Sequence, residues 1–348
     1  MCLKTVLENS SPGTNPMYSK IEFLRSGYEN KIDYLKGISI IFVILTHSLP
    51  FQDEILFPIW GGQAVPILLI IQALHYFRKG IIWNVRLEKL WKRIIFPFLI
   101  QNMIVVLVLA LFSRLSLEDI LSNMIYCGGN GPGSYYVWIY LQFVLLLPIY
   151  GVVYKWTGTK GVFILAITLS WAGELLASFF QLPNNIYRLF CGRYLFLPFI
   201  GLIWAKYGIV LNIKTIFFSI LGLISILLLH YSGINLSPFI CPSDWTYHHW
   251  ICYPYVAFLF PFILFYFYKK SNCVRICSFL CKCGKCSYEI FLCQMIVFKL
   301  FCVFYNHDFI SHFVAVSIKI PLTILLSLLP VFFSMIKDKF RNKSIQQL

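Results

Sequence analysis

Two ionisable side chains in the first apolar segment have a spacing that suits acid–base chemistry on one helix face. Lys36 and His47 are 11 residues apart, which places His47 about 20° past three full turns and about 16 Å further along a helix axis. Asp33 lies about 40° from the direction of His47 on the same helix. Ionisable groups in hydrocarbon are costly, so these three are expected to face a bundle interior or a water-filled cavity.

Each of these residues also has a purely structural interpretation. Lys36 can extend its charged head to the membrane surface, and His47 can hydrogen-bond a neighbouring helix. Asp33 can orient Lys36, or it can pair with Lys36 as an inert surface ion pair. Spacing alone gives the structural and the chemical interpretations about equal weight.

A basic cluster at the entrance to the third apolar segment suits phosphate binding. Lys89, Lys92 and Arg93 precede Pro97 there, and such side chains hold phosphate oxygens by charge-assisted hydrogen bonds. Contact with anionic lipid headgroups is the alternative, and the cluster alone favours it.

Four more polar residues inside apolar segments are candidates for substrate binding or oxyanion stabilisation. They are Gln142, Glu174, Arg193 and Gln294. Arg193 is suited to stabilise an oxyanion, although a structural ion pair with Glu174 is equally compatible with the sequence. The two amides need hydrogen-bond partners in an apolar bundle.

The elements that must position these residues are membrane-spanning helices. Of 348 residues, 59% are hydrophobic and 12% are charged, whereas soluble domains carry roughly 25% charged residues. A hydrocarbon core about 30 Å thick needs about 20 apolar residues per helix. The sequence predicts an all-α bundle of about ten transmembrane helices, near residues 35–51, 56–77, 94–113, 136–154, 162–180, 189–207, 213–230, 250–268, 287–306 and 312–336.

Lysine and arginine gather in alternate connections between these segments and in both tails. The positive-inside rule therefore predicts cytoplasmic termini and an even number of spans. We expect a multi-pass protein of the inner or plasma membrane, with cytoplasmic tails over residues 1–30 and 337–348 and a transmembrane domain over 31–336. The net charge of +15 is then explained by anchoring in the lipid bilayer, and no nucleic-acid partner is expected.

The cysteines are expected to be reduced packing residues. Five of them lie between the eighth and ninth segments, on the side assigned to the cytoplasm, where disulfides are rare: Cys273, Cys277, Cys281, Cys283 and Cys286. The first three recur every four residues, as on one helix face. Their spacing fits no pair of C-x2-C motifs, so no metal site is predicted. The pairing of Cys241 with Cys252, on the opposite side, stays open.

Several short motifs occur in a recognisable order along the chain. They are Lys36 with His47, Ala64-Val65-Pro66-Ile67, the stretch from Gly131 to Gln142, Arg193-Tyr194-Leu195 with Gly201, and Gly284 followed by Ser287-Tyr288-Glu289-Ile290-Phe291-Leu292. From about Lys31 to the last apolar segment, the sequence resembles the integral-membrane acyltransferase-3 family, the O-acyltransferases that modify cell-surface sugars and polysaccharides.

The sequence departs from that family's pattern at two places. The family's paired arginines at the entrance to the third span are not intact, so Arg93 stands for one and Lys89 or Lys92 must supply the other charge. Lysine lacks the planar fork that grips phosphate bidentately. Gln294 stands where the family often has a histidine, so no second imidazole is expected there.

The resemblance implies a membrane-bound O-acyltransferase that moves an acyl group, by default acetyl, from acyl-coenzyme A to a hydroxyl of a cell-surface polysaccharide or its sugar precursor. Acyl-coenzyme A is then a donor substrate, and no tightly bound cofactor is expected. Its phosphates are expected near Lys36, Lys89, Lys92 and Arg93. His47 is expected to act as general base on the sugar hydroxyl, because the pKa of an imidazole ordinarily lies close to neutral pH.

The alternative function is a transporter that exports polysaccharide or its lipid-linked precursor. Transporters also carry charged residues within spans. They more often show inverted repeats and helices broken by glycine or proline at matching positions, and the sequence shows neither.

Overall fold

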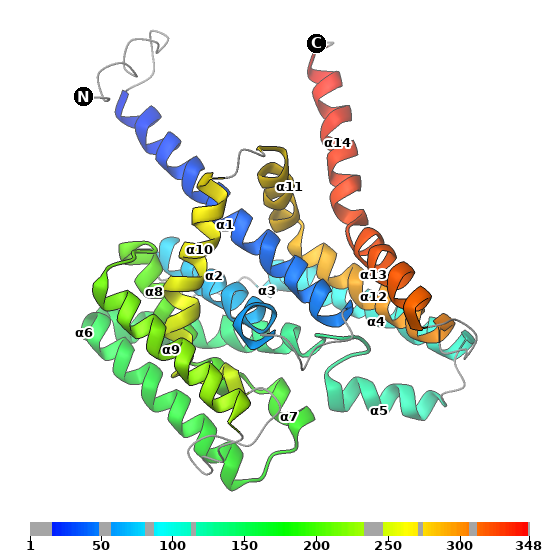
Figure 1. Ribbon diagram of the computed structural model, residues 1–348, viewed down its shortest axis with the longest axis horizontal. Helices are drawn as coiled ribbons and strands as arrows, with labels where there is room; N and C mark the ends of the chain where they lie inside the picture. Colours follow the sequence, from blue (N-terminus) through cyan, green and yellow to red (C-terminus); the bar gives the residue numbers. More distant parts are fainter. Residues whose placement is uncertain are drawn as a thin grey trace.

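The computed structural model describes residues 16–48, 57–80, 87–112, 116–232, 246–270, 274–305 and 312–346. These residues fold into helices and short connections, and no strand occurs among them (Figure 1). The predicted all-α fold class is therefore confirmed for this part of the chain. The open question of a Cys241–Cys252 disulfide lies outside the described residues, because it depends on residue 241.

Fourteen α-helices follow one another along the described residues. They are α1 (Pro16–Ser48), α2 (Ala64–Arg78), α3 (Leu87–Leu90), α4 (Phe96–Phe112), α5 (Leu117–Cys127), α6 (Tyr135–Phe179), α7 (Asn184–Leu189), α8 (Leu197–Tyr207), α9 (Ile213–Tyr231), α10 (Phe260–Lys270), α11 (Val274–Lys285), α12 (Ser287–Tyr305), α13 (His312–Ser327) and α14 (Leu329–Gln346). A π-helical turn, Trp91–Ile95, joins α3 to α4, and a second, Tyr255–Leu259, leads into α10.

Five helical segments within the described residues are long and apolar enough to cross a membrane. They are Phe57–Arg78, Leu87–Phe112, Tyr135–Phe179, Ile213–Tyr231 and Ile320–Asp338. The segment Tyr135–Phe179 corresponds to two predicted spans, because Gly158 leaves the helical conformation (φ 68°, ψ −160°) and bends it. Other predicted spans coincide with shorter helices, such as α8 with 11 residues. The structure thus supports a membrane protein, and the count of ten spans stays a prediction.

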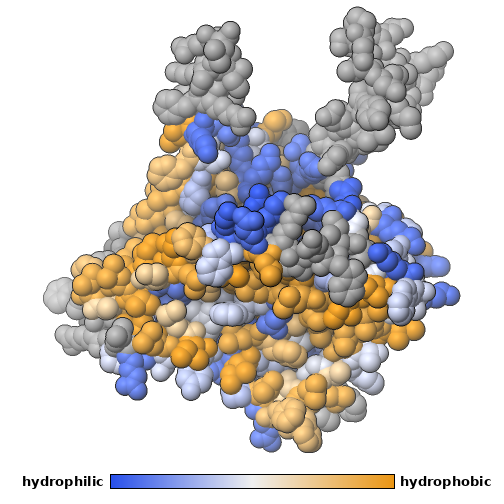
Figure 2. Space-filling model, turned by 180° about the vertical axis from the view of Figure 1, so that it is seen from behind, coloured by the Kyte–Doolittle hydropathy of each residue, from blue (hydrophilic) through white to orange (hydrophobic). Residues whose placement is uncertain are grey.

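The surface of the molecule matches this membrane character. Large apolar side chains such as Leu107, Leu145 and Phe217 are more than half exposed on α4, α6 and α9. Figure 2 shows a broad apolar band across one face of the molecule, with many hydrophilic residues gathered above it. Because α1 begins and α14 ends at the same end of the molecule (Figure 1), the arrangement is the one that an even number of spans requires.

Helix α5 lies outside the predicted spans, although its ends carry ordinary signals. The side chain of Ser116 accepts a hydrogen bond from the backbone N–H of Asp119, and the Asp119 carboxylate accepts one from the N–H of Ser116. This capping box starts α5. Gly128, in the left-handed conformation at φ 72°, ends it. The segment is too short and too polar to be recognised as a membrane span, so hydrophobicity alone does not predict it.

Helices α1 and α11 approach each other so closely that their backbones touch. A Cβ atom on Gly37 would collide with the carbonyl of Leu280, and one on Gly284 would collide with the carbonyl of Asp33. Two glycines, one on each helix, therefore permit the crossing, as small residues do in membrane bundles. The crossing fixes the position of Asp33 and Lys36 on α1 and of α12, which follows α11 directly.

We expect Gly284→Ala to destabilise the protein by about 1–3 kcal/mol or more, because the added methyl group forces the two backbones apart. Thermal unfolding of the detergent-purified protein measures this as a lowered midpoint. Ser278→Ala, at an exposed position of the same helix, is the matched control and should unfold like the wild type. Equal midpoints for the two variants would show that the crossing tolerates a side chain.

The described cysteines of α11 and the adjoining turn pack as the fourfold spacing predicts. Cys277 and Cys281 are half-buried on one side of α11, and Cys281 Sγ lies 3.3 Å from the carbonyl oxygen of Asn30. Cys283 is buried, and none of these described thiols forms a disulfide. Cys273 lies outside the described residues.

Candidate active site

A cavity of about 1100 Å³ opens between α1, α2, the turn before α4, α6 and α12. At its mouth lie Glu29, Arg78 and Lys79, whose side chains are exposed. Residues lining its interior, such as Ile40, Ile71 and Phe291, are buried. The cavity therefore runs inward from a charged mouth to an apolar end.

The outer half of the cavity carries both signs of charge. Its lining includes three cations, Lys36, Arg78 and Lys79, together with His75 and the carboxylates of Glu29 and Asp33. Lys36 Nζ lies 2.7 Å from Asp33 Oδ1, and the two side chains are 21% and 15% exposed. The predicted contact between these residues is thus present, and both line the cavity.

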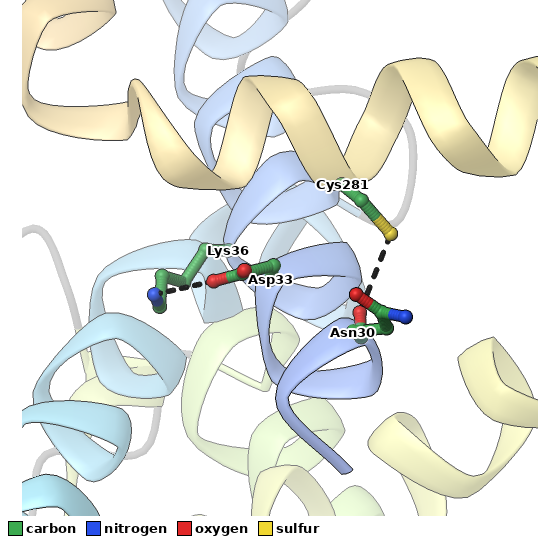
Figure 3. A network of polar contacts seen from close by, with 4 residues as sticks. All are labelled: Asn30, Asp33, Lys36 and Cys281. Carbon is green, nitrogen blue, oxygen red and sulfur yellow. Dashed lines mark hydrogen bonds and ion pairs between the residues drawn. The ribbon is translucent and has the colours of Figure 1, made fainter. Parts of the chain in front are cut away.

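The close crossing of α1 and α11 holds this ion pair in place. Figure 3 shows Asp33 and Lys36 on α1 while Cys281 reaches from α11 to the backbone of Asn30, one turn earlier on α1. Gly284 lies against the backbone of Asp33 itself. Gly284 opens the motif that continues from Ser287 to Leu292, so this motif contributes to the site through packing.

The inner end of the cavity is built from aromatic side chains. The ring centroids of Tyr136 and Phe291 are 5.5 Å apart in an edge-to-face arrangement, and Tyr288 stacks on Phe291 at 6.3 Å. The hydroxyl of Tyr288 donates to the carbonyl of Ile94 at 2.7 Å, which ties α12 to the turn before α4. The Gln72 amide donates to the carbonyl of Tyr140 at 3.1 Å and ties α2 to α6.

His47 lies next to this inner end but is not among the lining residues. Its partly exposed ring packs edge-to-face on Phe298, with centroids 5.8 Å apart. A Cβ atom on Gly133 would lie 3.9 Å from His47 Nε2 and 3.1 Å from Phe291 Cε2. Gly133 therefore lies close to both the imidazole and the Phe291 ring.

A glycine-rich loop before α6 places Gly133 there. The backbone N–H of Asn130 donates to Asn102 Oδ1 on α4 at 2.8 Å, and the Ser134 hydroxyl donates to the carbonyl of Cys127 at 3.0 Å. Gly133 has φ 85°, a conformation that favours glycine. The stretch from Gly131 to Gln142 thus brings a position without a side chain close to His47.

The predicted phosphate cluster lies apart from the cavity lining. Lys89, Lys92 and Arg93 are exposed, and none of them lines the cavity. Lys92 instead pairs with Glu88 at 2.7 Å on the surface. Ile94, which directly follows Arg93, does line the cavity, so the cluster stands beside the site at the start of α4.

Three of the other predicted residues are engaged in the packing of α6. Gln142 donates to the carbonyl of Leu189 at 2.6 Å and accepts from the N–H of Cys191 at 3.0 Å. Glu174 and Arg193 are both 3% exposed. Tyr187 lies between them, since its hydroxyl donates to Glu174 at 2.5 Å and the Arg193 guanidinium lies 4.2 Å above its ring. These contacts favour structural roles.

Gln294 lies on α12 between Phe291, which lines the cavity, and Phe298, which packs on His47. It is fully buried, and its amide has no hydrogen-bond partner among the described residues. On a helix, residues 291, 294 and 298 share one face. Gln294 thus faces the same side of α12 as Phe291 and Phe298 but does not line the cavity.

Sequence reasoning missed several residues of the cavity. His75, Arg78 and Lys79 lie at the end of α2, and the sequence offered the same signal there as for Lys89 and Lys92, namely cations at the end of an apolar segment. Gln72 gave a usable signal, as an amide inside a predicted span. Tyr288 and Phe291 belong to the late motif of the sequence, but their position at the cavity wall depends on tertiary packing.

The fold and the cavity describe a polytopic helical membrane protein with a charged entrance and an apolar interior. The sequence model of the acyltransferase-3 family, described as an acyltransferase domain, matches residues 29–336. The chain belongs to this family of membrane acyltransferases. A comparison with curated proteins found no match, and a comparison with solved structures found none either.

Proposed function

We propose that this protein moves an acyl group, by default acetyl, from acyl-coenzyme A to a hydroxyl of a cell-surface polysaccharide or its sugar precursor. The observation that carries the proposal is the cavity, whose mouth is charged and whose interior is apolar. Acyl-coenzyme A has the same division, with phosphates at one end and a neutral acyl-pantetheine arm at the other. The donor therefore enters with its phosphates at the mouth.

The cations of the mouth are the proposed phosphate ligands. Arg78 and Lys79 end α2 at the exposed rim, and Lys36 lies deeper beside Asp33. Charge-assisted hydrogen bonds to phosphate are among the strong ones. The positive-inside pattern assigns this rim to the cytoplasm, where acyl-coenzyme A is made. Arg93 directly precedes Ile94, which lines the cavity.

His47 is the proposed general base at the inner end. The hydroxyl oxygen of the acceptor forms a bond to the thioester carbonyl carbon while the imidazole accepts the hydroxyl proton. The carbon–sulfur bond then breaks, and the departing coenzyme A sulfur takes that proton from the imidazolium. The acyl end of a donor in the cavity lies against Phe291, whose ring is next to Gly133 and His47.

Acetyl-coenzyme A turnover by the purified protein tests this proposal. We expect the wild type in detergent to release free coenzyme A from acetyl-coenzyme A, and to do so faster when an acceptor polysaccharide is added. Mass spectrometry of surface glycans from cells with and without the protein should show an acetyl group that depends on it. An exporter would instead alter the amount of surface glycan and release no coenzyme A.

A further inference from the structure

Among the aromatic side chains at the inner end of the cavity, Phe291 is the one that lies close to Gly133. Phe291 lines the cavity, is 5% exposed, and packs against Tyr136 within the cavity wall. A Cβ atom on Gly133 would be 3.1 Å from this ring. The ring thus packs against the glycine-rich loop.

The imidazole of His47 lies close to the same glycine. Gly133 is the residue that the ring and the imidazole share, because the same Cβ position would be 3.9 Å from His47 Nε2. Seven residues after Phe291 on α12, Phe298 packs on the imidazole from another side. Residues seven apart lie about 20° apart around a helix, so one face of α12 presents a ring to the cavity and a ring to the imidazole.

We propose that Phe291 is a specificity-determining residue that restricts the donor to short acyl groups, an inference that rests on the proposed function. A thioester whose carbonyl is to meet His47 must lie at this inner end. Any acyl carbon beyond the carbonyl then competes with the Phe291 ring for space. A tightly packed wall rejects added methylenes because protein interiors hold few voids.

The acyl chain-length profile of two Phe291 variants tests this assignment. The measurement is the ratio of kcat/KM for butyryl-coenzyme A to that for acetyl-coenzyme A, with coenzyme A release as the readout. One methylene changes such ratios by about 10- to 200-fold, so the wild type should discriminate strongly against butyryl. Phe291→Ala should raise the ratio at least about tenfold, and Phe291→Leu, which keeps more of the packing, should raise it less.

Phe301→Ala is the matched control, since it removes another buried ring from α12 that does not line the cavity. It should lower thermal stability without altering the ratio. An unchanged ratio in both Phe291 variants, with acetyl turnover still measurable, would overturn the assignment and leave the acyltransferase proposal standing. Failure of the wild type to turn over any acyl-coenzyme A would overturn the proposed function and this assignment together.

Discussion

Replacing His47 with alanine should lower acyl transfer by about 10²- to 10⁴-fold, the range that a positioned general base contributes. The variant should still accumulate in the membrane, because His47 is partly exposed and the change removes one ring that packs on Phe298. Coenzyme A release in the presence of acceptor measures the loss. The KM for acetyl-coenzyme A should change little, since His47 does not line the cavity.

His230→Ala is the control for the loss of a histidine. That residue lies near the end of α9, where its ring packs on Tyr231 and Tyr247, and it is not a lining residue of the cavity. The control should keep wild-type transfer. Wild-type rates in the His47 variant would remove this imidazole from the mechanism, and the cavity would then need another base.

Replacing Arg78 or Lys79 with glutamine should raise the KM for acetyl-coenzyme A about tenfold or more, with a much smaller effect on kcat. A hydrogen bond to a charged group contributes about 1.5–3 kcal/mol, and each 1.4 kcal/mol is a factor of ten in affinity. The effect should shrink in high salt, because both side chains are exposed and screened. Steady-state kinetics at two ionic strengths measures both features.

Lys89→Gln and Lys92→Gln are the matched controls. Both residues are exposed cations near the same end of the molecule but outside the cavity lining, and Lys92 is already paired with Glu88. Their KM values should stay within about fivefold of the wild type, because an exposed ion pair contributes at most about 1 kcal/mol. If they rose as much as those of the cavity variants, the donor phosphates would lie over the start of α4, where the sequence alone placed them.

The sequence predicted the helical fold and the rough positions of the membrane segments because hydrophobicity is a local property. A long run of apolar residues is poorly solvated by water in any tertiary context. The segments around α2, α4, α6 and α9 can therefore be identified from the sequence alone. The charge pattern was equally informative, since lysine and arginine in alternate connections reflect each connection separately. The acyltransferase family was also evident, because its motifs lie within single segments.

Only the tertiary structure decided which residues meet at one site. Lys36, Arg78 and Phe291 come from α1, α2 and α12, and nothing local links them. The sequence directed attention to Lys89 and Lys92 because they cluster along the chain, whereas the cavity selects residues by the way the helices cross. That crossing depends on Gly37 and Gly284, where the backbones of α1 and α11 touch although the two glycines are far apart in the sequence. Proximity of this kind is a property of packing, so it appears only once the helices are placed against one another.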